Sequence, residues 1–106
     1  MSENIFVIST FSKLEENKEI NGANYGDIVT VGFRHSFEKA LEVVETNMLD
    51  IHEGIYPYAC IEEIPPQIYP DLASRQFFKF NSKKEGYERI EAPKFVKSAQ
   101  IVCSIG

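Results

Sequence analysis

Cationic, aromatic and amide side chains alternate in the back half of the chain, where residues 75–81 read RQFFKFN. If this run is a β-strand, successive side chains point to opposite faces, so Arg75, Phe77, Lys79 and Asn81 share one face. Arginine binds phosphate through paired hydrogen bonds, lysine adds a positive charge, a phenyl ring stacks on a base, and an amide pairs with a base edge. The row therefore predicts a nucleotide-binding surface.

Three residues outside the row are candidates to complete this site. Arg34 at the end of an earlier strand and Arg89 on the returning strand of a hairpin would add positive charge, and Tyr25 would close over the ligand from a long polar loop. The same row is also typical of a solvated sheet face, in which the stems of flanking cations shield the phenylalanine. The sequence leaves both interpretations open.

Residues typical of catalysis do not occur in a productive pattern. His52 and Glu53 are adjacent, and a small hydrolase that uses this pair is a third, weaker hypothesis. Glu62 and Glu63 are consecutive, so on a strand they point apart and cannot work as a carboxylate pair. The glycines match no phosphate-binding fingerprint, and no serine lies in a nucleophile elbow. We therefore expect binding without turnover, and no catalytic residue or cofactor.

Two cysteines, Cys60 and Cys103, each lie in an apolar run and are expected to be reduced, buried small residues. A disulfide between them is arithmetically possible, but nothing in the context favours it. Neither of the two histidines has a ligand-like spacing to a cysteine, so no metal site is predicted.

The elements that would position these residues suggest an α+β domain. β-Branched and aromatic runs predict strands at 4–10, 27–34, 57–64, 75–81, 87–91 and 99–105. Ser36 is a suitable N-cap for a helix over 37–47, whose apolar stripe comprises Phe37, Ala40, Leu41, Val44 and Met48. Residues 48–53 are expected to add a short helical turn. We predict one domain, 1–106, with a mainly antiparallel sheet of about six strands and one or two helices on one face, which leaves the other face open.

Charge and length restrict the partners. The 106 residues carry a net charge of −5, which argues against long DNA or RNA, because polymer binding depends on neutralising phosphates. Residues 1–73 carry 4 basic and 13 acidic side chains, a net −9, whereas residues 74–106 carry 7 basic and 3 acidic side chains, a net +4. This asymmetry suits self-association or a local anion site. The N-terminus does not read as a secretory signal, and no apolar run is long enough to span a membrane, so a cytoplasmic location is expected.

The overall pattern resembles a family of small phage and prophage proteins, the first-described type of Thoeris anti-defence protein. The segments that carry the resemblance are VGFRHSFEKALEVV, DIHEGIYPYACIEEIP, RQFFKFN and GYERIEAP, in that order along most of residues 4–106. The resemblance implies a non-enzymatic homo-oligomer in the host cytoplasm. Such a protein sequesters a cyclic nucleotide or cyclic ADP-ribose isomer and so keeps this signal from activating a bacterial immune effector. The alternative is a protein–protein adaptor that uses the open sheet face or an edge strand.

Overall fold

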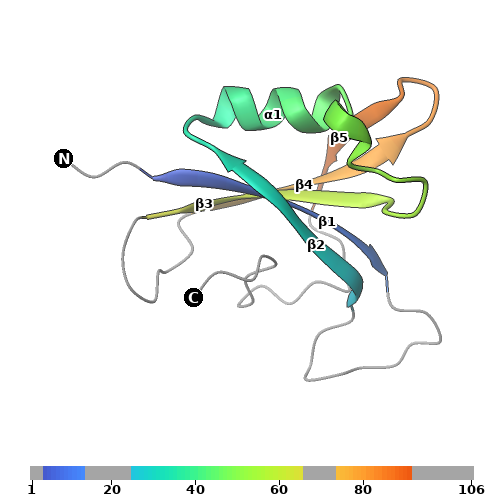
Figure 1. The fold of residues 1–106 in the computed structure, drawn as a ribbon, viewed down its shortest axis with the longest axis horizontal. Coiled ribbons are helices and arrows are strands. Elements are labelled where there is room, and N and C mark those ends of the chain that lie inside the picture. The colour runs from blue at the N-terminus through green and yellow to red at the C-terminus, as the bar shows by residue number, and fades with distance from the viewer. Residues whose placement is uncertain (1–3, 14–24, 66–73, 92–106) are drawn as a thin grey trace.

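Five strands rich in β-branched and aromatic residues form an antiparallel sheet in the computed structural model, which describes residues 4–13, 25–65 and 74–91 (Figure 1). The strands are β1 (Ile5–Lys13), β2 (Tyr25–Arg34), β3 (Tyr58–Ile64), β4 (Ser74–Asn81) and β5 (Gly86–Ile90). Across the sheet they follow the order β2-β1-β3-β4-β5, and every neighbouring pair is antiparallel. The predicted α+β class is therefore confirmed.

The strand predictions hold with two qualifications. Strands β1 and β2 pair with each other, and they extend beyond the predicted strands at 4–10 and 27–34 into the segment expected to be a long polar loop. The predicted strand over 99–105 lies outside the described residues. In the part of the chain that the structure describes, the sheet has five strands rather than about six.

Helix α1 (Phe37–Glu45) lies along one face of the sheet (Figure 1). Its predicted cap is confirmed, because the Ser36 hydroxyl accepts a hydrogen bond from the Lys39 backbone N–H at 3.3 Å. Ala40, Val43 and Val44 are buried against the sheet. At the end of the helix a Cβ on Gly86 would collide with the Glu45 carbonyl, so glycine is required where α1 meets β5.

The alternation of side chains gives the sheet two distinct faces. The face covered by α1, called the helix face, contributes Ile8, Ala59, Ile61, Phe78 and Tyr87 to a core shared with the helix, and Phe6 and Phe80 pack against it. The opposite face, called the far face, carries Val7, Phe11, Cys60, Ile64 and Phe77 in two smaller clusters. Both faces are buried along the central strands, so the sheet has apolar packing on both sides.

Candidate functional site

The predicted direction of the row on β4 is confirmed. Phe77 lies opposite Cys60 and Ile90 and belongs to the far-face cluster, whereas its neighbour Phe78 belongs to the core on the helix face. Arg75 lies opposite Glu62, and Lys79 lies opposite Tyr58 and Glu88, on the same far face. The four predicted side chains therefore emerge from one surface of the strand.

That surface is not open, and this part of the prediction is wrong. The Phe77 side chain is only 4% exposed and packs edge-on against Phe11, with the ring centroids 6.3 Å apart. The Arg75 guanidinium lies 5.2 Å from the centroid of the Phe77 ring and 3.8 Å from a carboxylate oxygen of Glu62, which is completely buried. Phe77 is a core residue and Arg75 is the partner of a buried carboxylate, so the Phe77 ring is not available to stack on a base.

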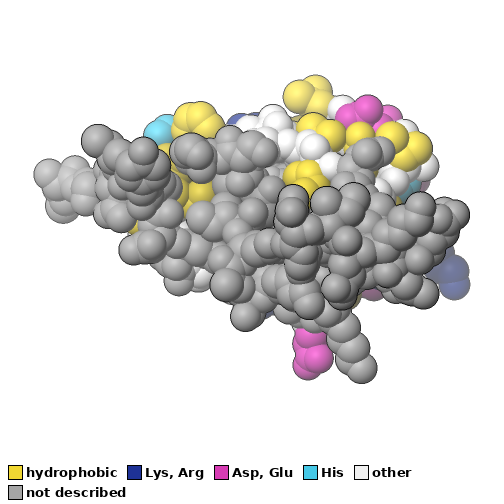
Figure 2. Space-filling view, turned by 90° about the horizontal axis from the view of Figure 1, so that it is seen from below, with side chains coloured by type: hydrophobic (Ala, Val, Ile, Leu, Met, Phe, Trp, Pro, Cys, Tyr) yellow, Lys and Arg dark blue, Asp and Glu magenta, His cyan; other side chains and the backbone are white. Residues whose placement is uncertain are grey.

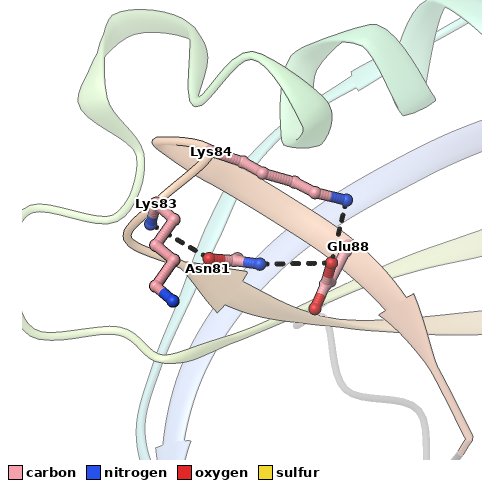
Figure 3. A network of polar contacts seen from close by, with 4 residues as sticks. All are labelled: Asn81, Lys83, Lys84 and Glu88. Carbon is pink, nitrogen blue, oxygen red and sulfur yellow. Dashed lines mark hydrogen bonds and ion pairs between the residues drawn. The ribbon is translucent and has the colours of Figure 1, made fainter.

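Asn81 is occupied by the turn between β4 and β5 (Figure 3). Its side-chain oxygen accepts a hydrogen bond from the Lys83 backbone N–H at 3.0 Å, and its amide nitrogen donates to Glu88 at 3.3 Å. The Lys84 ammonium lies 3.1 Å from the same carboxylate oxygen. This network closes the hairpin in the manner of an Asx-turn. The amide predicted to read a base edge therefore has a local structural role, and of the row only Lys79 is well exposed.

Two of the three supporting residues, Arg34 and Arg89, do not converge on the row. Arg34 lies opposite Phe6, and Arg89 lies opposite Phe78, so register places both arginines on the helix face, behind the sheet from Phe77. Tyr25 belongs to strand β2, where it pairs with Lys13, rather than to a loop. Arg34 and Arg89 therefore cannot share a site with Phe77, and the prediction failed because it used the order of the strands without knowing which face each arginine occupied.

A different cavity lies on the helix face, where β2 approaches the segment that follows α1. It has a volume of about 380 Å³, within the range of pockets that hold small ligands. Its lining residues come from the strands, the helix and residues 48–53: Ile8, Val29, Thr30, Val31, Gly32, Arg34, Val43, Met48, Leu49, Asp50, Ile51 and Glu53. The floor is apolar and continuous with the core, because Ile8, Val43 and Ile51 are buried members of the helix-face cluster.

Arg34 supplies the positive charge of this cavity. One guanidinium nitrogen donates to the neighbouring Phe33 carbonyl at 2.9 Å, and another lies 3.8 Å from the Met48 sulfur. Within residues 4–13, 25–65 and 74–91, no carboxylate forms an ion pair with Arg34. A guanidinium has five N–H donors, so most of its hydrogen-bonding capacity remains available to a ligand.

Two carboxylates, Asp50 and Glu53, line the cavity with Arg34. The pKa of the Tyr87 phenol is raised well above its ordinary value, first by burial and then by the nearby negative charges of Asp50 and Glu53. The two carboxylates therefore also act on a residue of the core. The buried Tyr87 hydroxyl donates to the Tyr56 carbonyl at 2.6 Å. The cavity thus offers donors at Arg34 and acceptors at the carboxylates, which suits a ligand with both an acidic group and hydroxyl or amino groups.

Residues 47–53 form the rim of this cavity and include the short 3-10 helix η2 (Met48–Asp50). The Asn47 side chain holds the segment together, because its oxygen accepts from the His52 backbone N–H at 2.9 Å and its nitrogen donates to Asp50 at 3.2 Å. The His52 ring stacks on Phe80, with the centroids 3.7 Å apart and the planes 3° from parallel. His52 therefore anchors the rim to the core by packing.

Sequence reasoning missed this cavity, because it forms only where β2 and residues 48–53 come together in space. One signal in the sequence was Leu49, an apolar residue that does not fit the helical stripe. In the structure this residue is 93% exposed. Exposed hydrophobic side chains also occur on β2 at Ile28, Val31 and Phe33. Figure 2 shows described hydrophobic side chains at the surface along one margin of the molecule, with acidic side chains next to some of them.

No protein-family model, curated protein or solved structure matches this chain. The described residues contain no helix long and apolar enough to cross a membrane. They also contain no group of three or more histidine, cysteine or acidic side chains that could hold a metal ion.

Proposed function

We propose that the protein is a non-enzymatic binding protein that captures a nucleotide-type small molecule in the cavity on the helix face. The observation that carries the proposal is Arg34, a guanidinium without a described carboxylate partner at the edge of an apolar cavity of ligand size. A phosphate would take the available donors of Arg34 in a charge-assisted pair. The apolar floor would receive a base, as is usual in small-molecule sites.

The two carboxylates support a nucleotide over a simple anion. Acidic side chains accept hydrogen bonds from ribose hydroxyls in dinucleotide-binding folds, which is a general use of carboxylates beside a sugar. Asp50 and Glu53 line the same cavity as Arg34, so a ribose between a base and a phosphate would have acceptors within the site. Inorganic phosphate would be repelled by the two carboxylates and has no ribose hydroxyls to donate hydrogen bonds to them.

The resemblance to Thoeris anti-defence proteins suggests which nucleotide to test. It implies a cyclic nucleotide or cyclic ADP-ribose isomer, held by a homo-oligomer in the host cytoplasm so that an anti-phage effector is not activated. Isothermal titration of cyclic AMP, cyclic GMP and cyclic ADP-ribose tests this, with mass spectrometry of the ligand released by denaturation. We expect binding of one of them and its recovery intact. Silence across the three at micromolar concentrations, or conversion of the ligand, would contradict the proposal.

Arg34 has a natural matched control. Arg89 was predicted for the same site and also lies on the helix face, but it is exposed and does not line the cavity. Arg34→Met should weaken binding of the nucleotide by roughly 10- to 100-fold, since hydrogen bonds to charged groups contribute about 1.5–3 kcal/mol. Arg89→Met should leave the affinity unchanged. Equal effects of the two substitutions would place the ligand elsewhere.

A protein–protein adaptor is the second candidate, favoured by the exposed side chains of Ile28, Val31 and Phe33 on β2. Exposed apolar side chains on a strand at the edge of the described sheet are a common docking feature. In this case Phe33→Ser would abolish binding of a partner protein in a pull-down, or self-association measured by sedimentation. The wild-type protein would show no nucleotide binding.

A further inference from the structure

The rim of the cavity is held in an unfavourable backbone conformation. Four non-glycine residues in the segment 47–53 have φ in the left-handed region: Asn47 at 50°, Leu49 at 55°, Asp50 at 56° and Glu53 at 51°. Asparagine and aspartate tolerate this region, because their short polar side chains bond locally, but leucine does not. Leu49 is therefore the residue least suited to its position on grounds of backbone conformation.

Burial does not offset this strain. The Leu49 side chain is 93% exposed, so its apolar surface contributes little to the core in the structure as it stands. The residues around it are fixed, because Asn47 bonds to both His52 and Asp50, and Ile51 is buried. Leu49 combines a strained backbone with an exposed apolar side chain at the lining of a ligand-sized cavity. An apolar contact from an occupant would bury that side chain and so offset part of the cost.

Leu49 and Val31 flank the cavity from opposite elements, since one belongs to η2 and the other to β2, and both are exposed and line it. Arg34 lines the same cavity and contacts Met48, the residue that precedes Leu49. The apolar and cationic groups are therefore close enough to bind the two ends of one small molecule. Such an occupant carries a flat or aliphatic apolar part at the rim and an acidic group at Arg34.

We infer that Leu49 is a ligand-contacting residue that determines specificity, because its side chain covers the apolar ring of the occupant whose acidic group is bound by Arg34. This deepens the proposed function and rests on it. A ligand with a base should depend on Leu49, whereas a sugar phosphate without a base should not. The substitution that tests this is Leu49→Asn, because asparagine accepts the left-handed conformation without the apolar contact.

The matched control is Glu85, which has φ of 54° and lies exposed in the β4–β5 turn rather than in the cavity. Both Leu49→Asn and Glu85→Asn should preserve the thermal midpoint or raise it by about a few degrees, because each relieves backbone strain without loss of buried surface. Leu49→Met keeps an apolar side chain at the rim and should retain most of the affinity.

The experiment compares titrations of cyclic AMP, cyclic GMP, cyclic ADP-ribose and ribose 5-phosphate into the wild type and the three variants. For whichever nucleotide the wild type binds, we expect Leu49→Asn to weaken the affinity by about tenfold, as for the loss of one buried apolar contact. It should leave ribose 5-phosphate binding unchanged, and Glu85→Asn should affect neither. Unchanged nucleotide affinity in Leu49→Asn, or a lowered thermal midpoint, would overturn the inference and leave the proposed function standing. A wild type that binds no probe would overturn both.

Discussion

Two arginines on opposite faces of the sheet lie beside apolar side chains, yet their surroundings differ in kind. On the far face, the Arg75 side chain is 10% exposed, lies over the Phe77 ring and pairs with the buried Glu62. On the helix face, Arg34 is partly exposed at a cavity, and among the described residues its hydrogen-bond partners are a carbonyl and a thioether. Arg75 is paired with a carboxylate inside the fold, whereas Arg34 retains N–H donors that a ligand could use.

This difference separates Arg75, which has a structural role, from Arg34, which we propose binds a ligand. A buried carboxylate needs a positive partner, since desolvation penalises an isolated charge in the interior. Arg75 meets that need, so its removal should change stability more than binding. Arg34 forms no ion pair with a described carboxylate, so its removal should change ligand binding more than stability. The distinction would be contradicted if substitution of Arg34 lowered stability more than binding, or if substitution of Arg75 lowered binding more than stability.

The largest expected effect is at Phe77. Phe77→Ala should lower the free energy of unfolding by about 3–5 kcal/mol, because it leaves a cavity among Phe11, Cys60 and Ile90. Phe33, which is 48% exposed, gives the control, and Phe33→Ala should change stability by less than about 1 kcal/mol. Urea denaturation measures both. A stable Phe77→Ala protein that had lost nucleotide binding would instead restore the far face as the site.

A somewhat smaller effect is expected at Arg75. Arg75→Met leaves Glu62 buried without this partner and should cost about 3 kcal/mol of stability, as for other broken buried pairs. Arg34→Met should cost less than about 1 kcal/mol by the same urea measurement, since it makes no described ion pair. Adding Glu62→Gln to Arg75→Met should recover part of the loss. Equal destabilisation by the two arginine variants would remove the distinction between them.

The sequence predicted which elements form and which way many side chains point. Period-two alternation placed Phe77 and Phe78 on opposite faces, and the Ser36 cap and the apolar stripe located the helix. These are local properties, decided within a few residues by backbone geometry and solvation. They sufficed for the α+β class and for the direction of the row on β4.

The sequence did not predict what lies over each face. Whether Phe77 is exposed depends on tertiary packing, and the pairing of Arg75 with Glu62 joins residues on different strands. The cavity at Arg34 likewise requires β2 to meet residues 48–53, whose left-handed conformations no common turn motif indicates. The site was misplaced because the alternation rule gives side-chain direction but not the cover on either side.

The smallest expected effect concerns Asn81 and its turn. The pKa of the exposed Glu88 carboxyl is lowered from its ordinary value of 4.5, first by hydrogen bonding to Lys84 and then by hydrogen bonding to Asn81. A lowered pKa in the folded state stabilises the fold above the unfolded pKa, and this contribution is lost as the pH falls through the folded value. Lys84→Met should therefore raise the pKa of Glu88 in an NMR titration. Any stability difference from the wild type should be present at neutral pH and vanish in acid. If Asn81 instead belonged to a ligand site, nucleotide addition would shift its amide resonances, and Asn81→Ala would weaken binding more than Lys84→Met does.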